Sequence, residues 1–183
     1  MAKHLFSWRH VALASALLCS LTALAQRVDI KTNALLWATG SPNLGAEFRV
    51  GRHVTLNFEG AVNYLKISSI NTKAAAFMPE VRYWFSGRPL AGHFVGLMGG
   101  AASYSTTFSQ TRHKGDVFAA GLTYGYSFVL SRHWSLEATA GVGVAHLNEK
   151  RFKTTEEAPA EANNKKWAPT LTKLGVTFVY IIK

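Results

Sequence analysis

Hydrophobic and polar residues alternate with a period of two along much of the chain. In residues 54–64, for example, the apolar Leu56 and Phe58 flank the polar Asn57. Such alternation is the pattern of a β-strand that has one apolar and one polar face. In full or weaker form, it predicts eight strands: 28–38, 43–50, 54–64, 75–85, 93–104, 117–130, 134–147 and 170–182. The fifth segment is apolar or small at both parities, so the sequence leaves its faces unassigned.

Segments of about ten alternating residues, separated by turns, are typical of outer-membrane β-barrels, whose periplasmic turns are short and whose outer loops are long. The connections after the even segments are short here, and those after the third, fifth and seventh are longer: 65–74, 105–116 and 148–169. We therefore expect an all-β fold, an eight-stranded antiparallel up-and-down transmembrane β-barrel. A soluble barrel that binds a hydrophobic ligand has the same period and stays an alternative.

The charged residues of these segments share the polar parity, which faces the inside of a closed membrane barrel. Eight strands enclose a space that side chains just fill. We therefore expect a closed, charge-plugged interior and no open channel. The predicted interior network consists of Asp29, Lys31, Glu47, Arg49, Glu59, Glu80, Arg82, Glu137 and Lys173.

The N-terminus has the features of a secretory signal peptide. A basic start precedes an apolar run over residues 11–24, and Ala23 and Ala25 form the small-x-small pattern of a cleavage site. We expect residues 1–25 to be removed and residues 26–183 to form the outer-membrane barrel domain. The apolar run is short for a transmembrane anchor, which needs about 20 residues.

The cysteine and the charge of the chain narrow the candidate partners. Cys19 lies inside the expected signal peptide, and the bulky Leu18 before it fits lipoprotein processing poorly. After residue 25 the chain has no cysteine, and its 18 basic and 10 acidic residues give a net charge of +8. Because an exported protein rarely meets nucleic acid, anionic lipid is the better expected partner of this basic chain.

Six short motifs are spread over nearly the whole chain after residue 25: Lys31-Thr32-Asn33, Pro42-Asn43-Leu44-Gly45, Glu80-Val81-Arg82-Tyr83-Trp84, Gly121-Leu122-Thr123-Tyr124-Gly125-Tyr126, Leu136-Glu137-Ala138 and Tyr180-Ile181-Ile182-Lys183. Together they resemble a family of Bacteroidetes proteins catalogued as a domain of unknown function, number 3575. The resemblance implies an outer-membrane barrel of the Bacteroidetes cell envelope. It implies no activity and carries over no catalytic residue.

Two kinds of chemistry remain as candidates. His133 and Ser135 locally resemble the His-x-Ser pattern of lipid A deacylases, but they lie at a predicted periplasmic turn, away from outer-leaflet lipid. Basic loop residues are candidates for lipopolysaccharide-phosphate contacts, although a solvated loop has the same composition. These residues are Arg112, Lys114, Lys150, Arg151, Lys153, Lys165 and Lys166.

The sequence thus favours a structural or surface-interaction role over catalysis. The histidines have no metal-ligand spacing, and no dinucleotide or phosphate-loop motif is present. We expect no cofactor, no defined catalytic activity and a monomer in the bacterial outer membrane. Expected partners are lipid, lipopolysaccharide and a surface or fimbrial protein. A lipid A-modifying enzyme is the alternative from another functional class.

Overall fold

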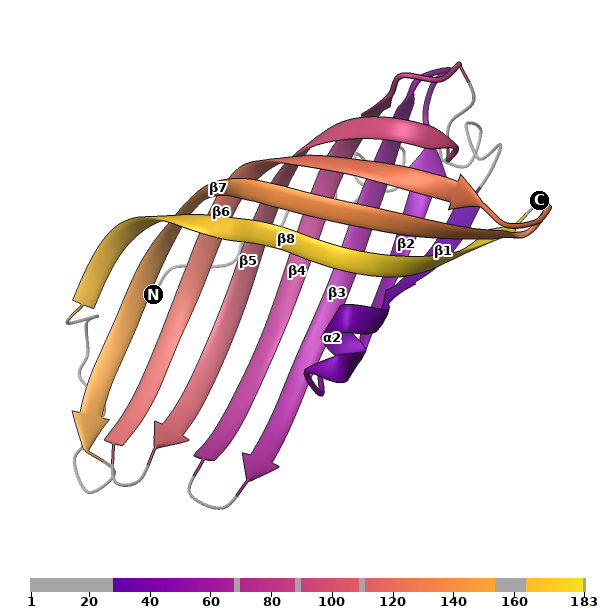
Figure 1. The fold of residues 1–183 in the computed structure, drawn as a ribbon. Coiled ribbons are helices and arrows are strands. Elements are labelled where there is room, and N and C mark those ends of the chain that lie inside the picture. Colours follow the sequence, from indigo (N-terminus) through magenta and orange to yellow (C-terminus); the bar gives the residue numbers. More distant parts are fainter. Residues whose placement is uncertain (1–27, 68–69, 88–89, 109–110, 154–163, 183) are drawn as a thin grey trace, which may run out of the picture.

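Eight strands form one closed antiparallel barrel in which neighbours in the sequence pair with each other (Figure 1). The computed structural model describes residues 28–67, 70–87, 90–108, 111–153 and 164–182. β8 also pairs with β1 and so closes the ring. The prediction of an all-β, eight-stranded, up-and-down barrel is confirmed. The strands are β1 (Val28–Asn33), β2 (Asn43–Arg49), β3 (Val54–Ile67), β4 (Ile70–Trp84), β5 (Gly92–Phe108), β6 (Thr111–Val129), β7 (Trp134–Lys153) and β8 (Asn164–Ile182).

A short helix, α2 (Ala34–Ala38), replaces the second half of the first predicted strand. β1 ends at Asn33, whose side-chain oxygen accepts a hydrogen bond from the backbone N–H of Leu35 at 3.0 Å. An asparagine in this position caps a helix and competes with strand pairing. The prediction that the strand continues to residue 38 is therefore wrong. Within the described residues, no helix is long and apolar enough to cross a membrane.

The strands are longer than predicted at the end of the barrel that carries the odd-to-even connections. Ile67 pairs with Ile70, and Phe108 pairs with Thr111. The loops predicted over 65–74 and 105–116 are thus mostly strand, and that prediction is wrong. Backbone pairing continues through polar residues because it does not depend on an apolar face. Figure 1 shows the resulting hairpins side by side at one end of the barrel.

The faces of β5, which the sequence left open, are now assigned. Phe94 and Met98 are buried inside the barrel, whereas Val95 and Leu97 are exposed on its outer face. The other strands have the same arrangement: large apolar side chains are exposed on the outer face, and the side chains buried inside are mostly polar. The expected signal peptide, residues 1–25, lies outside the described residues.

A small apolar cluster closes the interior near the short turns. Trp84 and Phe94 lie with ring centroids 4.7 Å apart, and Leu90 packs with them. The hydroxyl of Ser127 donates a hydrogen bond of 3.1 Å to the carbonyl of Leu90, which holds the β4–β5 turn inside the barrel end. The guanidinium of Arg82 lies 4.5 Å from the centre of the Phe94 ring, so this cluster borders the charged part of the interior.

Candidate functional site

Arg82 is the centre of a buried cluster of charges inside the barrel. Its Nη1 lies 2.9 Å from Glu47 Oε2 and 3.1 Å from Glu137 Oε2. Its Nη2 lies 2.9 Å from Glu80 Oε2. Since Glu47 is on β2, Arg82 on β4 and Glu137 on β7, these ion pairs join strands that are not neighbours. They therefore cross the lumen.

Two lysines extend this cluster toward β1 and β8. Lys31 forms ion pairs with Glu47 and, at 2.6 Å, with Glu137. Lys173 Nζ lies 2.7 Å from Glu59 Oε1 and 2.9 Å from Glu80 Oε2. Each buried cation thus meets at least two carboxylates. The interior charge cluster consists of Lys31, Glu47, Glu59, Glu80, Arg82, Glu137 and Lys173.

Neutral polar side chains also support the carboxylates of the interior charge cluster. Thr55 donates a hydrogen bond to Glu47, and Thr123 donates one to Glu80. Asn57 Nδ2 lies 2.8 Å from Glu59 Oε1 and completes a third such contact. Buried charges are tolerated when ion pairs and further hydrogen bonds replace water. Every charged group of the cluster has such an ion pair, whereas Arg82 Nε and Asn57 Oδ1 are buried without a hydrogen-bond partner among the described residues.

The other two of the nine residues predicted for the interior are Asp29 and Arg49. Asp29 is buried on the same inner face, directly opposite Glu47 in the β1–β2 register. Arg49 is half-buried at the end of β2, where its Nε donates a hydrogen bond of 3.2 Å to the carbonyl of Gly51. Arg49 has the parity of the inward-facing residues, but it is the last residue of β2 and so lies at the turn.

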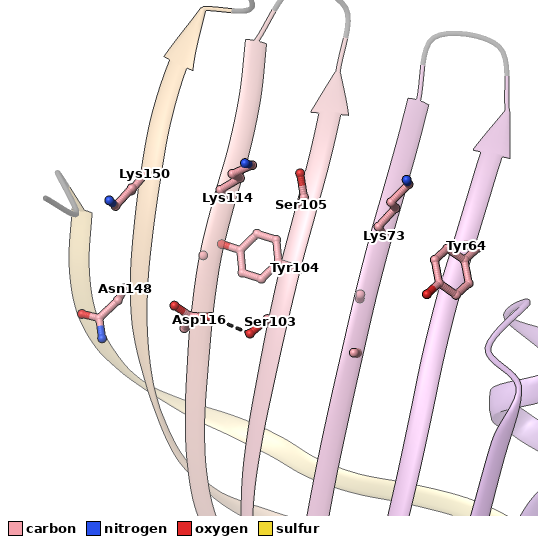
Figure 2. A pocket seen from close by; sticks show the side chains of 12 residues that line it. Tyr64, Lys73, Ser103, Tyr104, Ser105, Lys114, Asp116, Asn148 and Lys150 are labelled. Carbon is pink, nitrogen blue, oxygen red and sulfur yellow. Dashed lines mark hydrogen bonds between the residues drawn. The ribbon is translucent and has the colours of Figure 1, made fainter. Parts of the chain in front are cut away.

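A second polar site lies on the outer face, where the hairpins extend past the apolar band. Register pairing aligns one residue from each of five neighbouring strands, β3 to β7. Figure 2 shows these side chains around an open groove of about 550 Å³. We call this the outer groove. The aligned residues are Tyr64, Lys73, Ser105, Lys114 and Lys150.

The lysines of the outer groove share the parity of exposed apolar residues. Lys73 and Phe77 are both outward on β4, as are Lys114 and Phe118 on β6. One step closer to the apolar band, Ser103 Oγ donates a hydrogen bond of 2.6 Å to Asp116 Oδ1 (Figure 2). We call Lys73, Lys114 and Lys150 the lysine row.

A family model described as "Protein of unknown function (DUF3575)" matches residues 11–182. The chain belongs to this family. No curated protein matches the chain. The crystal structure of CarO from Acinetobacter baumannii is similar at 12% sequence identity and a TM-score of 0.35, covering 85% of this chain and 94% of that chain. A TM-score this low supports no functional argument.

Membership of the family confirms the resemblance that the motifs indicated, whereas the Bacteroidetes source stays a prediction. Three of the motifs contribute directly to the interior charge cluster. They place Lys31 on β1, Glu80 and Arg82 on β4, and Glu137 on β7. In this chain those motif residues therefore hold the interior together.

The basic residues predicted to contact lipopolysaccharide fall into three groups. Lys114 and Lys150 line the outer groove, and Lys165 and Lys166 are exposed on β8 beside it. The side chains of Arg112, Arg151 and Lys153 lie outside the described residues.

Lys73 was missed by sequence reasoning because it fell in a predicted loop. Its parity could have indicated this position, because Lys73 lies four residues before Phe77 and therefore faces the same side of the strand.

The proposed catalytic pair is not assembled by the fold. His133 is exposed at the turn, where its ring stacks on Tyr180 with centroids 6.1 Å apart. Ser135 is fully buried inside the wall. The side chains therefore lie on opposite faces and cannot act as a base and its nucleophile. Among the residues described, no group of three or more His, Cys, Asp or Glu side chains could hold a metal ion.

Proposed function

We propose that this chain is an integral outer-membrane protein, with its apolar wall against lipid and its lumen closed by the interior charge cluster. The observation that carries the proposal is the inversion of the two faces. Large apolar side chains are exposed all around the barrel, and the charged side chains of the interior charge cluster are buried within it. Soluble monomers rarely expose contiguous apolar patches larger than a few hundred Å².

Aromatic side chains support a defined depth in the membrane. Tyr83, Trp134 and Tyr180 are exposed near the short turns, while Tyr64 and Trp167 are exposed toward the hairpin end. Amphipathic rings prefer the headgroup level of a bilayer. The short turns then face the periplasm, and the longer hairpins extend outward from the cell.

The closed interior favours a structural or surface-interaction role over conduction. The ion pairs of Arg82 cross the lumen, and the ring of Trp84 blocks one end together with Phe94. A permeating ion would have to separate buried pairs, which is costly. The hairpins that project beyond the apolar band are the surface available to partners. We expect no steady conductance steps when the purified protein is added to a planar bilayer.

One pair of matched substitutions tests whether the apolar wall contacts lipid. Leu122 and Leu130 are 66% and 61% exposed, but Leu122 is in the middle of the outer band and Leu130 is at a turn. An arginine at the middle of a lipid-facing band lowers barrel stability by about 2–4 kcal/mol, and far less at the interface. Leu122→Arg should therefore reduce the heat-modifiable band in the outer-membrane fraction, and Leu130→Arg should not.

The opposite result would identify a soluble barrel. If the native chain stays in buffer without detergent and Leu122→Arg is as harmless as Leu130→Arg, the outer face contacts water. The membrane proposal would then be wrong. A periplasmic barrel that binds a hydrophobic ligand would replace it.

A further inference from the structure

The lysine row places like charges side by side. Lys114 and Lys150 are directly opposite each other on β6 and β7, and only Ser105 separates Lys114 from Lys73. Neighbouring strands are about 4.8 Å apart, so Lys73 and Lys114 are about 10 Å apart along the row. Like charges directly opposite each other destabilise a sheet. The row therefore favours an anion that lowers this repulsion.

Few carboxylates of the described residues lie near Lys73 and Lys114. In the described part of the chain, the groove is lined by one carboxylate, Asp116, which accepts its hydrogen bond from Ser103. No ion pair between described residues includes Lys73 or Lys114. Glu149 pairs with His113 on the inner face of the same hairpins.

An apolar hollow continues directly from the polar groove toward the membrane. It has a volume of about 230 Å³, and it shares Ala75, Ser103 and Asp116 with the outer groove. Its sides are the exposed rings of Phe77 and Phe118, and Ala101 is paired with both of them across β4, β5 and β6. The small alanine between two large rings leaves a slot that runs along the strands.

The two hollows together have the chemistry of one amphipathic ligand. Lys73 and Phe77 are four positions apart, a distance of about 13 Å along the strand. Lysine side chains can lay their apolar stems along such a surface while the ammonium group stays at the polar level. A phosphate group accepts charge-assisted hydrogen bonds from such ammonium groups, and an acyl chain fills an apolar slot. Tyr64, at the end of the row, adds a ring and a hydroxyl suited to the headgroup region.

We propose that the outer groove binds one phosphorylated lipid of the outer leaflet. Lys73 and Lys114 contact its phosphate, Ser105 donates a hydrogen bond between them, and an acyl chain lies over Ala101 between Phe77 and Phe118. This inference rests on the proposed membrane location. It differs from contacts made by mobile basic loops because every residue named belongs to a regular strand. Lipid bound in this way would tie the hairpins to the membrane surface.

The test compares lipid binding by three variants of the full-length protein, each folded in detergent. Native mass spectrometry would measure binding of bisphosphorylated lipid A, of the same lipid without phosphates, and of inorganic phosphate. Lys73→Met with Lys114→Met removes two charges from the groove. Arg52→Met with Arg132→Met removes two exposed charges from the opposite end of the barrel. Ala101→Trp fills the slot and leaves the lysines in place.

The expected result is specific to the groove. The double lysine variant should bind lipid A about tenfold or more weakly, given a contribution of about one kcal/mol for each lysine near a lipid surface. The double arginine variant should match the native protein. Ala101→Trp should also weaken lipid A binding. Removing the phosphates should weaken binding by the native protein and make no further difference to the double lysine variant.

Other results would overturn the inference. Equal losses in the lysine and arginine variants would indicate non-specific attraction to charge. Competition by inorganic phosphate together with full binding of lipid A by Ala101→Trp would indicate a phosphate site that does not use the apolar slot. Heat-modifiable migration of each variant shows separately whether the barrel is folded. If the native barrel folds in detergent but does not bind lipid A, this inference fails and the membrane proposal stands.

Discussion

Lysines on the two faces of the same wall have opposite surroundings. Lys31 and Lys173 are inside, 1% and 7% exposed, and each contacts two carboxylates. Lys73 and Lys114 are outside and exposed, and they form no ion pair with any described residue. A lysine that is removed from water requires counter-charges from the protein. One that stays at the surface can obtain them from solvent or from lipid.

The comparison predicts that removal of an inner charge destabilises the barrel, whereas removal of an outer one does not. Inside, the loss of one partner leaves buried charges uncompensated, and that cost is several kcal/mol. Outside, water and salt screen the change. Four sets of substitutions compare the inner and outer faces, from the largest expected effect on stability to the smallest. Three of them remove charges, and one adds a methyl group.

Arg82→Met should have the largest effect, because Arg82 contacts Glu47, Glu80 and Glu137 at once. We expect the free energy of unfolding to fall by about 3–5 kcal/mol. Urea titration of the detergent-folded barrel, followed by tryptophan fluorescence, measures it. Adding Glu80→Gln to Arg82→Met should restore part of the loss. A loss below about 1 kcal/mol would mean that the cluster contributes little to stability.

Lys173→Met should have the next largest effect, since Lys173 bridges Glu59 and Glu80. Loss of this bridge should lower the free energy of unfolding by about 3 kcal/mol. The matched control is Lys73→Met, the same substitution on the outer face, which should leave the urea midpoint unchanged in lipid-free detergent. Equal effects at the two positions would contradict the contrast between the faces.

Gly96→Ala tests how tightly the inner face is packed. A Cβ at Gly96 would lie 2.5 Å from Glu80 Oε1 and would also collide with the hydroxyl of Thr123. We expect a loss of about 1–3 kcal/mol, as for other overpacked sites. Gly99→Ala on the outer face of the same strand would meet nothing within 4 Å and should not destabilise the barrel. Thermal melts of the two variants side by side would decide.

Lys114→Met should have the smallest effect and the opposite sign. It removes the repulsion between Lys114 and Lys150, which are directly opposite each other in the sheet. In lipid-free detergent at low salt we expect a gain of at most about 0.5 kcal/mol. The gain should vanish at 1 M salt, where screening is strong. Destabilisation that persists at high salt would show that Lys114 has a structural role.

Much of the barrel could be predicted because the period of two defines both faces of each strand at once. Leu122 and Thr123 are adjacent in the sequence, and the alternation correctly placed them on opposite faces: Leu122 is exposed and Thr123 is buried. Alternation could not predict where strands end. Asn33 ends β1 through a side-chain hydrogen bond, and Ile67 continues β3 to the tip of a hairpin. Neither feature follows from apolar periodicity.

The candidate sites were predictable to different degrees for the same reason. The parity of Glu47, Arg82 and Glu137 indicated one shared face, but only the closed ring brings β2, β4 and β7 within ion-pair distance. Lys73 and Lys114 are far apart in the sequence and fell in two separate predicted loops. Their alignment depends on the register of β4, β5 and β6, which single-strand patterns do not contain.

By itself, the sequence determined the strand number, the polarity of the faces of every strand except β5, and the family, because these are local properties repeated along the chain. The tertiary structure decided which charges meet across the lumen and which lysines form one row outside. Both depend on closure and register. Backbone hydrogen bonds between consecutive strands set the register, and the pairing of β8 with β1 closes the ring. The alternation in the sequence thus predicts which face of the sheet a side chain occupies. The register between strands decides which side chains lie next to it.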